Sequence, residues 1–268
     1  MSLQRTVFTI AVTCIGRAAL ARDFLLGRLH AMRRQAQAGR HPVSRQFISS
    51  NDRLLDCAYV RSVDGEPEAV LLICHGIGET VEYWIPVQQL LAEHGVASLV
   101  FDYSGYGRSQ GPADWNHFEQ DAIATFEHLK ALHPATPVSL LGFSMGSGVA
   151  TAVLDRTQPD QLILCAAFTS FREAACSLGV PRRCAAVLPA IWSGEAALRS
   201  FHRPVLIVHG EQDRKFPLRM AKQLATWCEG RADLAVVPGH SHNEPFYRPQ
   251  LAYWGEIVKW LVENGRSP

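Results

Sequence analysis

One serine stands between two glycines in the run GFSMG at residues 142–146. A serine hydroxyl becomes a nucleophile when a neighbouring base takes its proton, as in acyl transfer. Such a serine usually occupies a strained turn between a strand and a helix, where small neighbours are required. Gly142 and Gly146 leave that space, and a short apolar run precedes the motif. The pattern predicts that Ser144 is a nucleophile at a strand-to-helix turn.

A carboxylate and an imidazole follow this serine in the chain. Asp213 lies in the loop HGEQDRKFP, directly after an apolar run, and Glu211 in the same loop is a rival for its role. His240 and His242 lie in the later run PGHSHN, and their spacing alone does not separate them. The order serine, aspartate, histidine is typical of one hydrolase fold, in which the acid orients the base and stabilises its charged form.

Two backbone N–H groups would also be needed where a carbonyl oxygen becomes negative during acyl transfer. The N–H of Met145, directly after the serine, is the first candidate. The N–H of Ile77, in the loop HGIGE at the end of an apolar run, is the second. In the same regions we expect His75 to orient its loop by hydrogen bonds. Asp102 is expected to hold its own loop through backbone N–H groups.

The elements that would position these residues alternate along the chain. Two segments alternate apolar and polar side chains, as an antiparallel pair does; they are 45–49 and 54–61. Short continuous apolar runs, typical of strands buried on both faces, occupy 70–74, 97–101, 138–142, 162–166, 205–209 and 234–237. Helical periodicity is found in 81–94, 115–132, 145–156, 217–229 and 250–264. This alternation predicts an α/β fold, with a mostly parallel, doubly wound sheet of about eight strands flanked by helices. Ligands bind such sheets beyond the carboxyl ends of the strands.

The composition describes a globular protein. Its 268 residues include 26 basic and 25 acidic side chains, a formal charge of +1, which does not favour nucleic acid as a partner. Hydrophobic residues make up 47% of the chain, enough for a sizeable core. The seven cysteines are scattered without metal-ligand spacing, which favours a reducing compartment over a disulfide scaffold or a zinc site.

The first 41 residues differ from the rest of the chain. An apolar run from Thr6 to Gly16 is too short to span a bilayer and is followed by several arginines. We interpret residues 1–41 as an amphipathic or membrane-associating helical segment, with the helix from about Val7 to Gln37. A secretory signal or anchor and a disordered segment remain alternatives. Residues 42–268 form the predicted catalytic domain, and the expected location is the cytoplasm, with peripheral membrane contact through the first segment.

Taken together, these motifs resemble the α/β-hydrolase superfamily, specifically its serine-aminopeptidase and monoglyceride-lipase-like branch. The resemblance extends from about Arg45 to Leu261 and is carried by HGIGE, FDYSGYGRSQG, GFSMGSG and HGEQDRKFP. It implies that His242, rather than His240, is the base, because many members end in Pro-Gly-x-Gly-His-Asn. It also implies a short cap over about residues 168–202, as in small esterases.

The resemblance and the motifs together predict a serine hydrolase. The expected substrate is a small molecule with a medium or long acyl chain, held as an ester or thioester and cleaved through an acyl-enzyme. No metal or organic cofactor is needed. One alternative is an aminopeptidase, in which Glu79 or Glu173 would hold the substrate's amine. An alternative of another class is a non-catalytic ligand receptor or scaffold.

Overall fold

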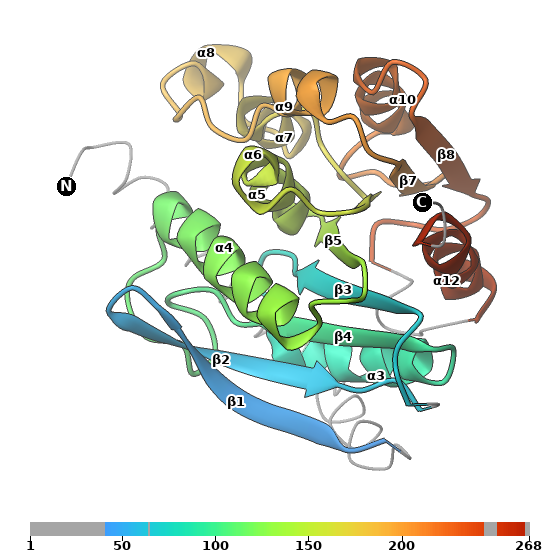
Figure 1. Cartoon of the computed structure of the whole chain (residues 1–268). Helices are drawn as coiled ribbons and strands as arrows, with labels where there is room; N and C mark the ends of the chain where they lie inside the picture. Colours follow the sequence, from blue (N-terminus) through green and yellow to red (C-terminus); the bar gives the residue numbers. More distant parts are fainter. Residues whose placement is uncertain (1–40, 64, 244–250, 266–268) are drawn as a thin grey trace.

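A computed structural model of the chain describes residues 41–63, 65–243 and 251–265 (Figure 1). The helix expected over residues 7–37 lies outside these ranges, so it stays a prediction. Among the helices described, none is both long and apolar enough to cross a membrane.

The predicted sheet is confirmed, with eight strands in the order β1-β2-β4-β3-β5-β6-β7-β8. The strands are β1 (Val43–Ser50), β2 (Arg53–Val60), β3 (Ala69–Cys74), β4 (Val96–Phe101), β5 (Val138–Phe143), β6 (Leu162–Cys165), β7 (Val205–Gly210) and β8 (Ala232–Val237). The first strand pairs antiparallel with β2, and β2 pairs antiparallel with β4. All other neighbours are parallel. The antiparallel pair expected from the alternating segments is therefore present, and it forms one edge of the sheet.

The central strands are apolar on both faces because both faces are covered. In β3, Val70 and Leu72 belong to one hydrophobic cluster, whereas Leu71 and Ile73 belong to another. Successive side chains of a strand point to opposite sides, so these clusters are the two cores of a three-layered molecule. Each of these four side chains is fully buried. Burial of both faces of the sheet therefore explains the continuous apolar runs in the sequence as well as the three layers of the fold.

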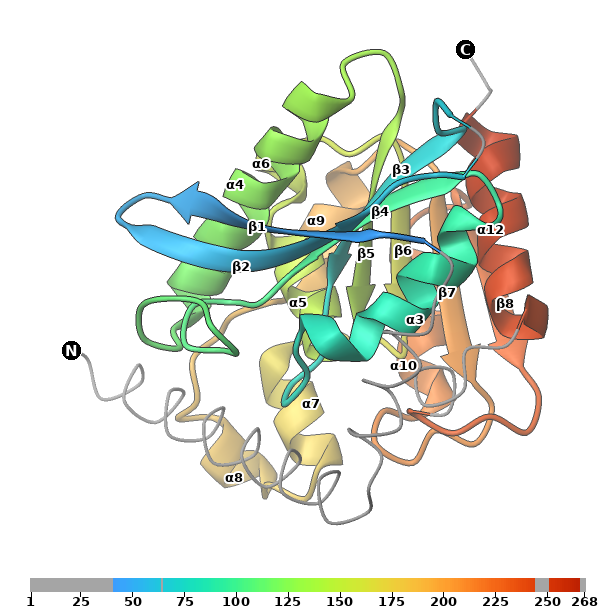
Figure 2. The ribbon, with the colours of Figure 1, turned by 90° about the horizontal axis from the view of Figure 1, so that it is seen from below.

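Helices form the two outer layers. The described helices are α3 (Val81–Ala92), α4 (Trp115–Leu132), α5 (Met145–Ala152), α6 (Leu154–Thr157), α7 (Phe171–Ser177), α8 (Arg182–Ala185), α9 (Gly194–Ser200), α10 (Leu218–Trp227) and α12 (Leu251–Gly265). Side chains of α3 and α12 join one hydrophobic cluster, and those of α4, α5, α9 and α10 join the other. Figures 1 and 2 show the same division, with α3 and α12 on one side of the sheet and α4 on the opposite side.

The helix expected over residues 145–156 is interrupted in the structure. Val153, with φ −107° and ψ 4°, separates α5 from α6. Two residues earlier, the hydroxyl of Thr151 donates to the carbonyl oxygens of Ser147 and Gly148, both at 3.0 Å. Such bonds from a threonine back to its own helix favour bending. The first half of the helix, which follows Ser144, is unaffected.

The parallel strands bring their carboxyl ends to one edge of the sheet. In the register of β3 and β5, Cys74 lies opposite Gly142, and Phe143 at the end of β5 lies opposite Cys165 of β6. The strand β7 continues the same edge beside β6. The loops that carry Ile77, Ser144 and Asp213 therefore leave the sheet side by side, as the sequence predicts.

Candidate active site

Ser144 occupies a strained turn between β5 and α5. Its φ of 51° and ψ of −115° fall outside the regions favoured by residues with a side chain. A conformation of this kind costs about 1–3 kcal/mol and persists only where the surroundings enforce it. Here the N–H of Ser144 donates to the carbonyl of Cys165 at 3.0 Å. The hydroxyl of Ser147 donates to the carbonyl of Ser144 at 2.6 Å, a contact that we did not predict.

The two glycines of the motif are required by close contacts. A Cβ on Gly142 would lie 2.5 Å from the carbonyl oxygen of Gly146. A Cβ on Gly146 would lie 1.9 Å from the carbonyl oxygen of Cys74, the last residue of β3. The start of α5 therefore touches the backbone from which the HGIGE loop begins. This contact places the N–H groups of Met145 and Ile77 on neighbouring loops.

His242 joins Ser144 to Asp213. Its Nε2 lies 2.9 Å from Oγ of Ser144, and its Nδ1 lies 2.7 Å from Oδ2 of Asp213. Each of the three residues is 6% exposed. A serine, an imidazole and a carboxylate connected in this order can pass a proton from the hydroxyl to the ring and stabilise the resulting imidazolium.

The protonation states favoured at this site suit that chemistry. Burial lowers the pKa of His242 below its ordinary value, and this effect outweighs the hydrogen bond to Asp213, which acts in the opposite direction. Burial acts to raise the pKa of Asp213, but the hydrogen bond and charge of His242 and the N–H of Phe216 bring it below its ordinary value. At neutral pH the ring is therefore neutral and the carboxylate ionised.

The carboxylate of Asp213 is held by its own loop. Its Oδ1 accepts hydrogen bonds from the N–H groups of Lys215 and Phe216, at 2.8 and 2.9 Å. The buried ring of His209 bonds to the carbonyl of Phe216 at 2.8 Å and lies 3.5 Å from Oδ2 of Asp213. Oδ2 thus remains directed at His242, while Oδ1 anchors the loop. His209 therefore stabilises the structure of this loop.

Two aromatic rings enclose the imidazole. The ring centroid of Phe216 lies 5.1 Å from that of His242, nearly perpendicular to it, and the centroid of Phe143 lies 5.5 Å away. Both phenylalanines are buried. They restrict the orientation of the ring and remove water from it, which accounts for its lowered pKa. Phe143 directly precedes Ser144 in the chain, and the sequence did not indicate this contact with the imidazole.

The two rival residues lie elsewhere. The ring of His240 bonds to the carbonyl of Pro238 at 2.9 Å on the exposed side of its turn. The carboxylate of Glu211 accepts from the N–H of Gly239 at 3.2 Å and is exposed. The structure therefore brings His242 and Asp213 to Ser144. His240 and Glu211 instead stabilise the turn that precedes His242.

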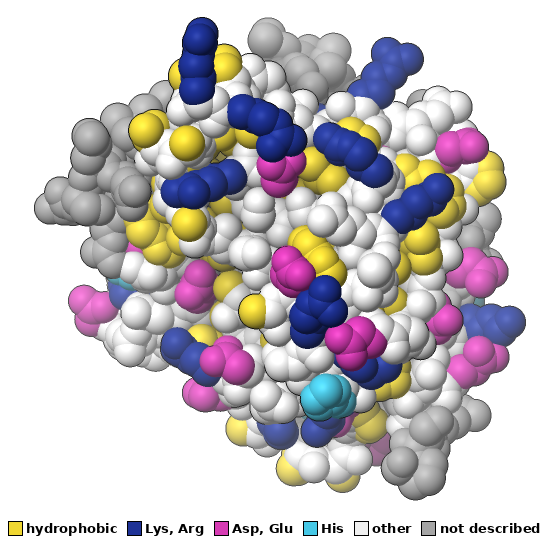
Figure 3. Space-filling view, turned by 90° about the horizontal axis from the view of Figure 1, so that it is seen from above, with side chains coloured by type: hydrophobic (Ala, Val, Ile, Leu, Met, Phe, Trp, Pro, Cys, Tyr) yellow, Lys and Arg dark blue, Asp and Glu magenta, His cyan; other side chains and the backbone are white. Residues whose placement is uncertain are grey.

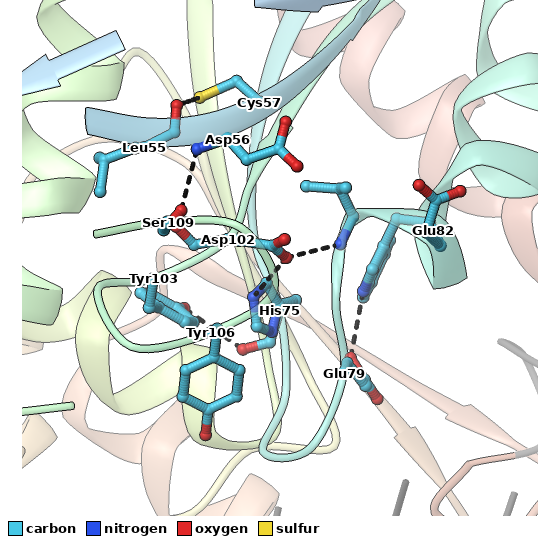
Figure 4. A network of polar contacts seen from close by, with 12 residues as sticks. Leu55, Asp56, Cys57, His75, Glu79, Glu82, Asp102, Tyr103, Tyr106 and Ser109 are labelled. Atoms are coloured by element: carbon cyan, nitrogen blue, oxygen red, sulfur yellow. Dashed lines mark hydrogen bonds and ion pairs between the residues drawn. The ribbon is translucent and has the colours of Figure 1, made fainter. Parts of the chain in front are cut away.

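The HGIGE loop is organised by Glu79, a role that the sequence analysis missed. Oε2 of Glu79 accepts from the N–H of Gly76 at 2.8 Å. It also accepts from the indole N–H of Trp84 at 3.1 Å, the bond drawn at Glu79 in Figure 4. Glu79 is 8% exposed, so its carboxylate is committed to its own loop. Within the described residues, the N–H of Ile77 and that of Met145 have no acceptor. Both remain available to an oxygen atom of a ligand.

Asp102 lies beneath this loop, and the role expected for it was wrong. Its Oδ1 accepts from the N–H of Val81, the first residue of α3, at 2.8 Å, rather than from an N–H of its own loop (Figure 4). A Cβ on Gly107 would lie 1.8 Å from its Oδ2. Burial raises the pKa of Asp102 to about 7, although the hydrogen bond from Val81 opposes the shift. Asp102 thus connects the glycine-rich loop after β4 to the helix after the HGIGE loop.

His75 orients its loop, as expected. Its ring Nδ1 bonds to the carbonyl of Gly76 at 2.8 Å. Its ring centroid lies 4.5 Å from that of Tyr103, whose hydroxyl donates to the carbonyl of His75 at 3.2 Å. Burial lowers the pKa of His75 to about 4, so the ring is neutral. His75 therefore supports the HGIGE loop.

The segment expected to form a cap contains both core and surface residues. Trp192 and Phe201 are each 5% exposed, and Trp192 packs on Gly148 of α5, so these two side chains belong to the core rather than to an exposed cap. Arg182 and Arg183, by contrast, are exposed. The six cysteines among the described residues are free, and these residues contain no group of three or more potential metal ligands.

A comparison with known protein families matches part of the chain. A family model described as serine aminopeptidase, S33, matches residues 65–194. The matched segment contains Ile77, Ser144 and Met145 but ends before Asp213 and His242.

Related proteins include lipases. Protein ABHD12B of Homo sapiens is 30% identical over 217 residues, and the alignment covers 70% of this chain and 59% of that protein. Lysophosphatidylserine lipase ABHD12 of Xenopus tropicalis is 31% identical over 221 residues, covering 73% of this chain and 56% of the lipase. The chain thus spans less than two thirds of the length of these relatives.

A solved structure has the same fold. Est1E of Butyrivibrio proteoclasticus, with ferulic acid bound, superposes with a TM-score of 0.67 at 22% identity, covering 82% of this chain and 98% of Est1E. The eight-stranded sheet, the order of the motifs along it and these comparisons lead to one family. The chain belongs to the α/β-hydrolase superfamily.

Proposed function

We propose that this chain is a serine hydrolase that cleaves carboxylic ester or thioester bonds of substrates with a medium or long acyl chain. One observation carries the proposal: Ser144, His242 and Asp213 form a continuous, buried line of hydrogen bonds. Ser144 is the nucleophile, His242 the general base and acid, and Asp213 the residue that orients His242.

The reaction proceeds in two halves. Oγ of Ser144 forms a bond to the carbonyl carbon of the substrate while Nε2 of His242 takes the hydroxyl proton. The tetrahedral intermediate then collapses, the alcohol or thiol leaves, and His242 returns the proton to it. Water attacks the acyl-enzyme with His242 again as base, which releases the acid and restores Ser144. No cofactor takes part in these steps.

The N–H groups of Ile77 and Met145 stabilise the negative oxygen of both intermediates. Loss of one such donor costs about 3–4 kcal/mol of transition-state stabilisation where it has been measured. The contact of Gly146 with Cys74 supports this role, because it sets the spacing of the two loops. Glu79 supports it by holding Gly76, the residue before Ile77.

An acyl ester is favoured over a peptide as substrate. The relatives named lysophosphatidylserine lipase support a lipid ester. The name of the matched family favours an aminopeptidase, which needs a carboxylate to hold the amine of its substrate. Glu79, one of two candidates, already accepts two hydrogen bonds, and the other, Glu173, pairs with Arg182. Glu79 is therefore committed to these two bonds, whereas Glu173 would have to exchange its surface ion pair for the amine of a substrate.

A comparison of two serine variants on two substrate panels tests the proposal. We expect the full chain to hydrolyse p-nitrophenyl esters, with kcat/KM increasing from acetyl to longer acyl chains, and to leave aminoacyl arylamides intact. Ser144→Ala lowers kcat on the order of a million-fold, as for a triad serine elsewhere. Ser193→Ala, at an exposed position without a side-chain cap bond, retains full activity.

Three results would contradict the proposal. Substantial ester hydrolysis by Ser144→Ala would remove the nucleophile from the mechanism. A wild-type chain that binds acyl esters without turning them over would favour the ligand receptor, and preference for arylamides would favour the peptidase.

A further inference from the structure

The surface beside the candidate active site combines exposed aliphatic and basic side chains. Val187 is 72% exposed and Leu178 54%, the two highest values for large hydrophobic side chains among the described residues. Both lie in residues 178–187, which follow α7 and include α8; we name this segment the cap tip. Arg182 and Arg183, between them, are also exposed. Exposed apolar side chains that gather with charges mark interaction sites more often than isolated ones do.

Hydrogen bonds fix the cap tip to the neighbouring part of the cap. The guanidinium of Arg172, on α7, donates two hydrogen bonds to the carbonyl of Leu188, at 3.0 and 2.7 Å. The N–H of Val180 donates to the carbonyl of Ala175 on α7 at 3.0 Å, and Ala185, within the tip, is buried. The exposure of its aliphatic side chains is therefore a feature of the folded molecule.

The cap tip lies at the edge of the sheet that carries Ser144. Helix α7 follows β6, whose last residue, Cys165, accepts a hydrogen bond from the N–H of Ser144. At the other end of α7, the hydroxyl of Ser177 donates to the carbonyl of Lys215 at 2.5 Å, two residues after Asp213. Figure 2 shows α7 and α8 together beyond the ends of the central strands. A surface bound by the cap tip would thus lie close to the active site.

Charge is distributed unequally over the domain. Residues 171–222, which contain the cap and the Asp213 loop, have nine Arg or Lys and four Asp or Glu. Residues 41–170 have six and fifteen. On the face drawn in Figure 3, dark blue side chains and yellow patches alternate over much of the upper half of the picture. Basic residues therefore outnumber acidic ones in the segment that contains the cap, whereas the preceding part of the domain is acidic.

The basic groups of the cap tip are largely available to a partner. Arg183 makes no ion pair or hydrogen bond within the described residues. Arg182 pairs with Glu173 at 3.1 Å, but its side chain is 78% exposed, and such surface pairs are weak. A multivalent anionic surface can therefore engage both guanidinium groups.

We propose that the cap tip docks the domain onto an anionic phospholipid bilayer. Arg182 and Arg183 pair with lipid phosphates and carboxylates, while Leu178 and Val187 enter the zone between headgroups and acyl chains. The exposed aliphatic side chains favour a bilayer over a nucleic acid as the partner, because a nucleic acid presents phosphates but no apolar layer. Residues 1–40 of the chain are an unsuitable partner for the cap tip. They contain seven arginines and one acidic residue, so their charge has the same sign as that of Arg182 and Arg183.

Vesicle binding by the Ser144→Ala variant of this chain tests the surface without any hydrolysis, so the result does not depend on the proposed activity. We expect the chain to cosediment with vesicles containing about 30% phosphatidylserine and much less with pure phosphatidylcholine. R182Q/R183Q lowers the partition coefficient at least tenfold, since each basic residue near such a surface contributes about fivefold. L178S/V187S lowers it several-fold.

A matched control carries changes of the same type at the opposite edge of the sheet. L132S/R156Q replaces a leucine that is 49% exposed at the end of α4 and an exposed arginine of α6, and we expect its binding to equal that of the parent chain. All exchanged residues are exposed, so thermal unfolding of each variant should match the parent.

The proposal is overturned if the parent chain does not bind anionic vesicles. It is also overturned if both cap-tip variants bind as tightly as the parent, which would assign the contact to another part of the chain. A parent that is dimeric in sedimentation, with monomeric cap-tip variants and no vesicle binding, would identify the surface as a contact between copies of the chain.

Discussion

Nε2 of His242 lies 2.9 Å from Oγ of Ser144, although 98 residues separate the two in the chain. The serine follows a central strand, whereas the histidine follows β8 at the far edge of the sheet. The loop that carries His242 reaches back across the end of β7: a Cβ on Gly210 would lie 2.4 Å from the carbonyl oxygen of His240. This contact lets Asp213, just after β7, reach the same ring.

The pH dependence of catalysis should reflect the buried imidazole. The base must be neutral, so kcat/KM rises as the pH increases through the pKa of His242 in the free enzyme. Because burial lowers that pKa below its ordinary value, we expect the midpoint of the rise to lie on the acid side of neutral pH. Initial rates with a stable ester from about pH 4.5 to 9 check this. A midpoint above 7 would contradict the arrangement.

Replacement of Asp213 should lower turnover without removing the nucleophile. In Asp213→Asn, the side chain no longer holds His242 in the required tautomer, and we expect kcat to decrease on the order of 10⁴-fold. Glu211→Gln, in the same loop, should retain activity because an amide oxygen can still accept from the N–H of Gly239. Equal losses in the two variants would show that the loop as a whole, rather than Asp213, is required.

Gly146→Ala should disrupt the elbow. Its Cβ would lie 1.9 Å from the carbonyl oxygen of Cys74, which neither backbone can avoid without moving. We expect the free energy of unfolding to decrease by about 1–3 kcal/mol and kcat/KM to fall with the displaced N–H groups. Gly265→Ala, whose Cβ would meet its nearest atom at 3.7 Å, is the control. Urea titrations of both variants measure the effect, and a Gly146→Ala chain as stable and active as the control would refute the packing argument.

Asp102 should make stability depend on pH. Its pKa is about 7 in the folded chain and near 3.8 when unfolded, so the folded state holds its proton more tightly. The folded state is favoured at low pH, and this contribution is lost as the pH rises from about 4 to about 7. We expect Asp102→Asn, which retains an acceptor for Val81, to gain stability relative to the wild type across that interval. Parallel unfolding curves at each pH would contradict this.

The strands could be predicted because burial on both faces produces continuous apolar runs. The predicted range 138–142 differs by one residue from β5, and 70–74 by one residue from β3. The edge strand β8 begins two residues before the predicted 234, because the polar Asp233 interrupts its apolar pattern. The helices α7, α8 and α9 have four to seven residues, too few for a periodic signal, and contacts such as that of Arg172 with Leu188 hold the cap together.

The proximity of Ser144, Asp213 and His242 could be predicted because strand ends in a parallel sheet share one edge. The roles of Asp102 and Glu79 could not, since their partners depend on how separate loops approach one another. Asp102 bonds to an N–H that precedes it by 21 residues, on a different loop. Glu79 was considered only as a ligand for an amine, because nothing in its spacing indicates that Gly76 and Trp84 surround it.

Labelling with a fluorophosphonate tests the role of Ser144 most directly. The measurement identifies which residue is modified and how fast the adduct forms. Such a probe reacts with an activated serine, and mass spectrometry of the digested chain identifies the labelled residue. We predict a single adduct, on Ser144, that forms on the order of a thousandfold more slowly in His242→Ala and at the wild-type rate in His240→Ala. A chain that remains unlabelled, or is labelled at another serine, would contradict the account.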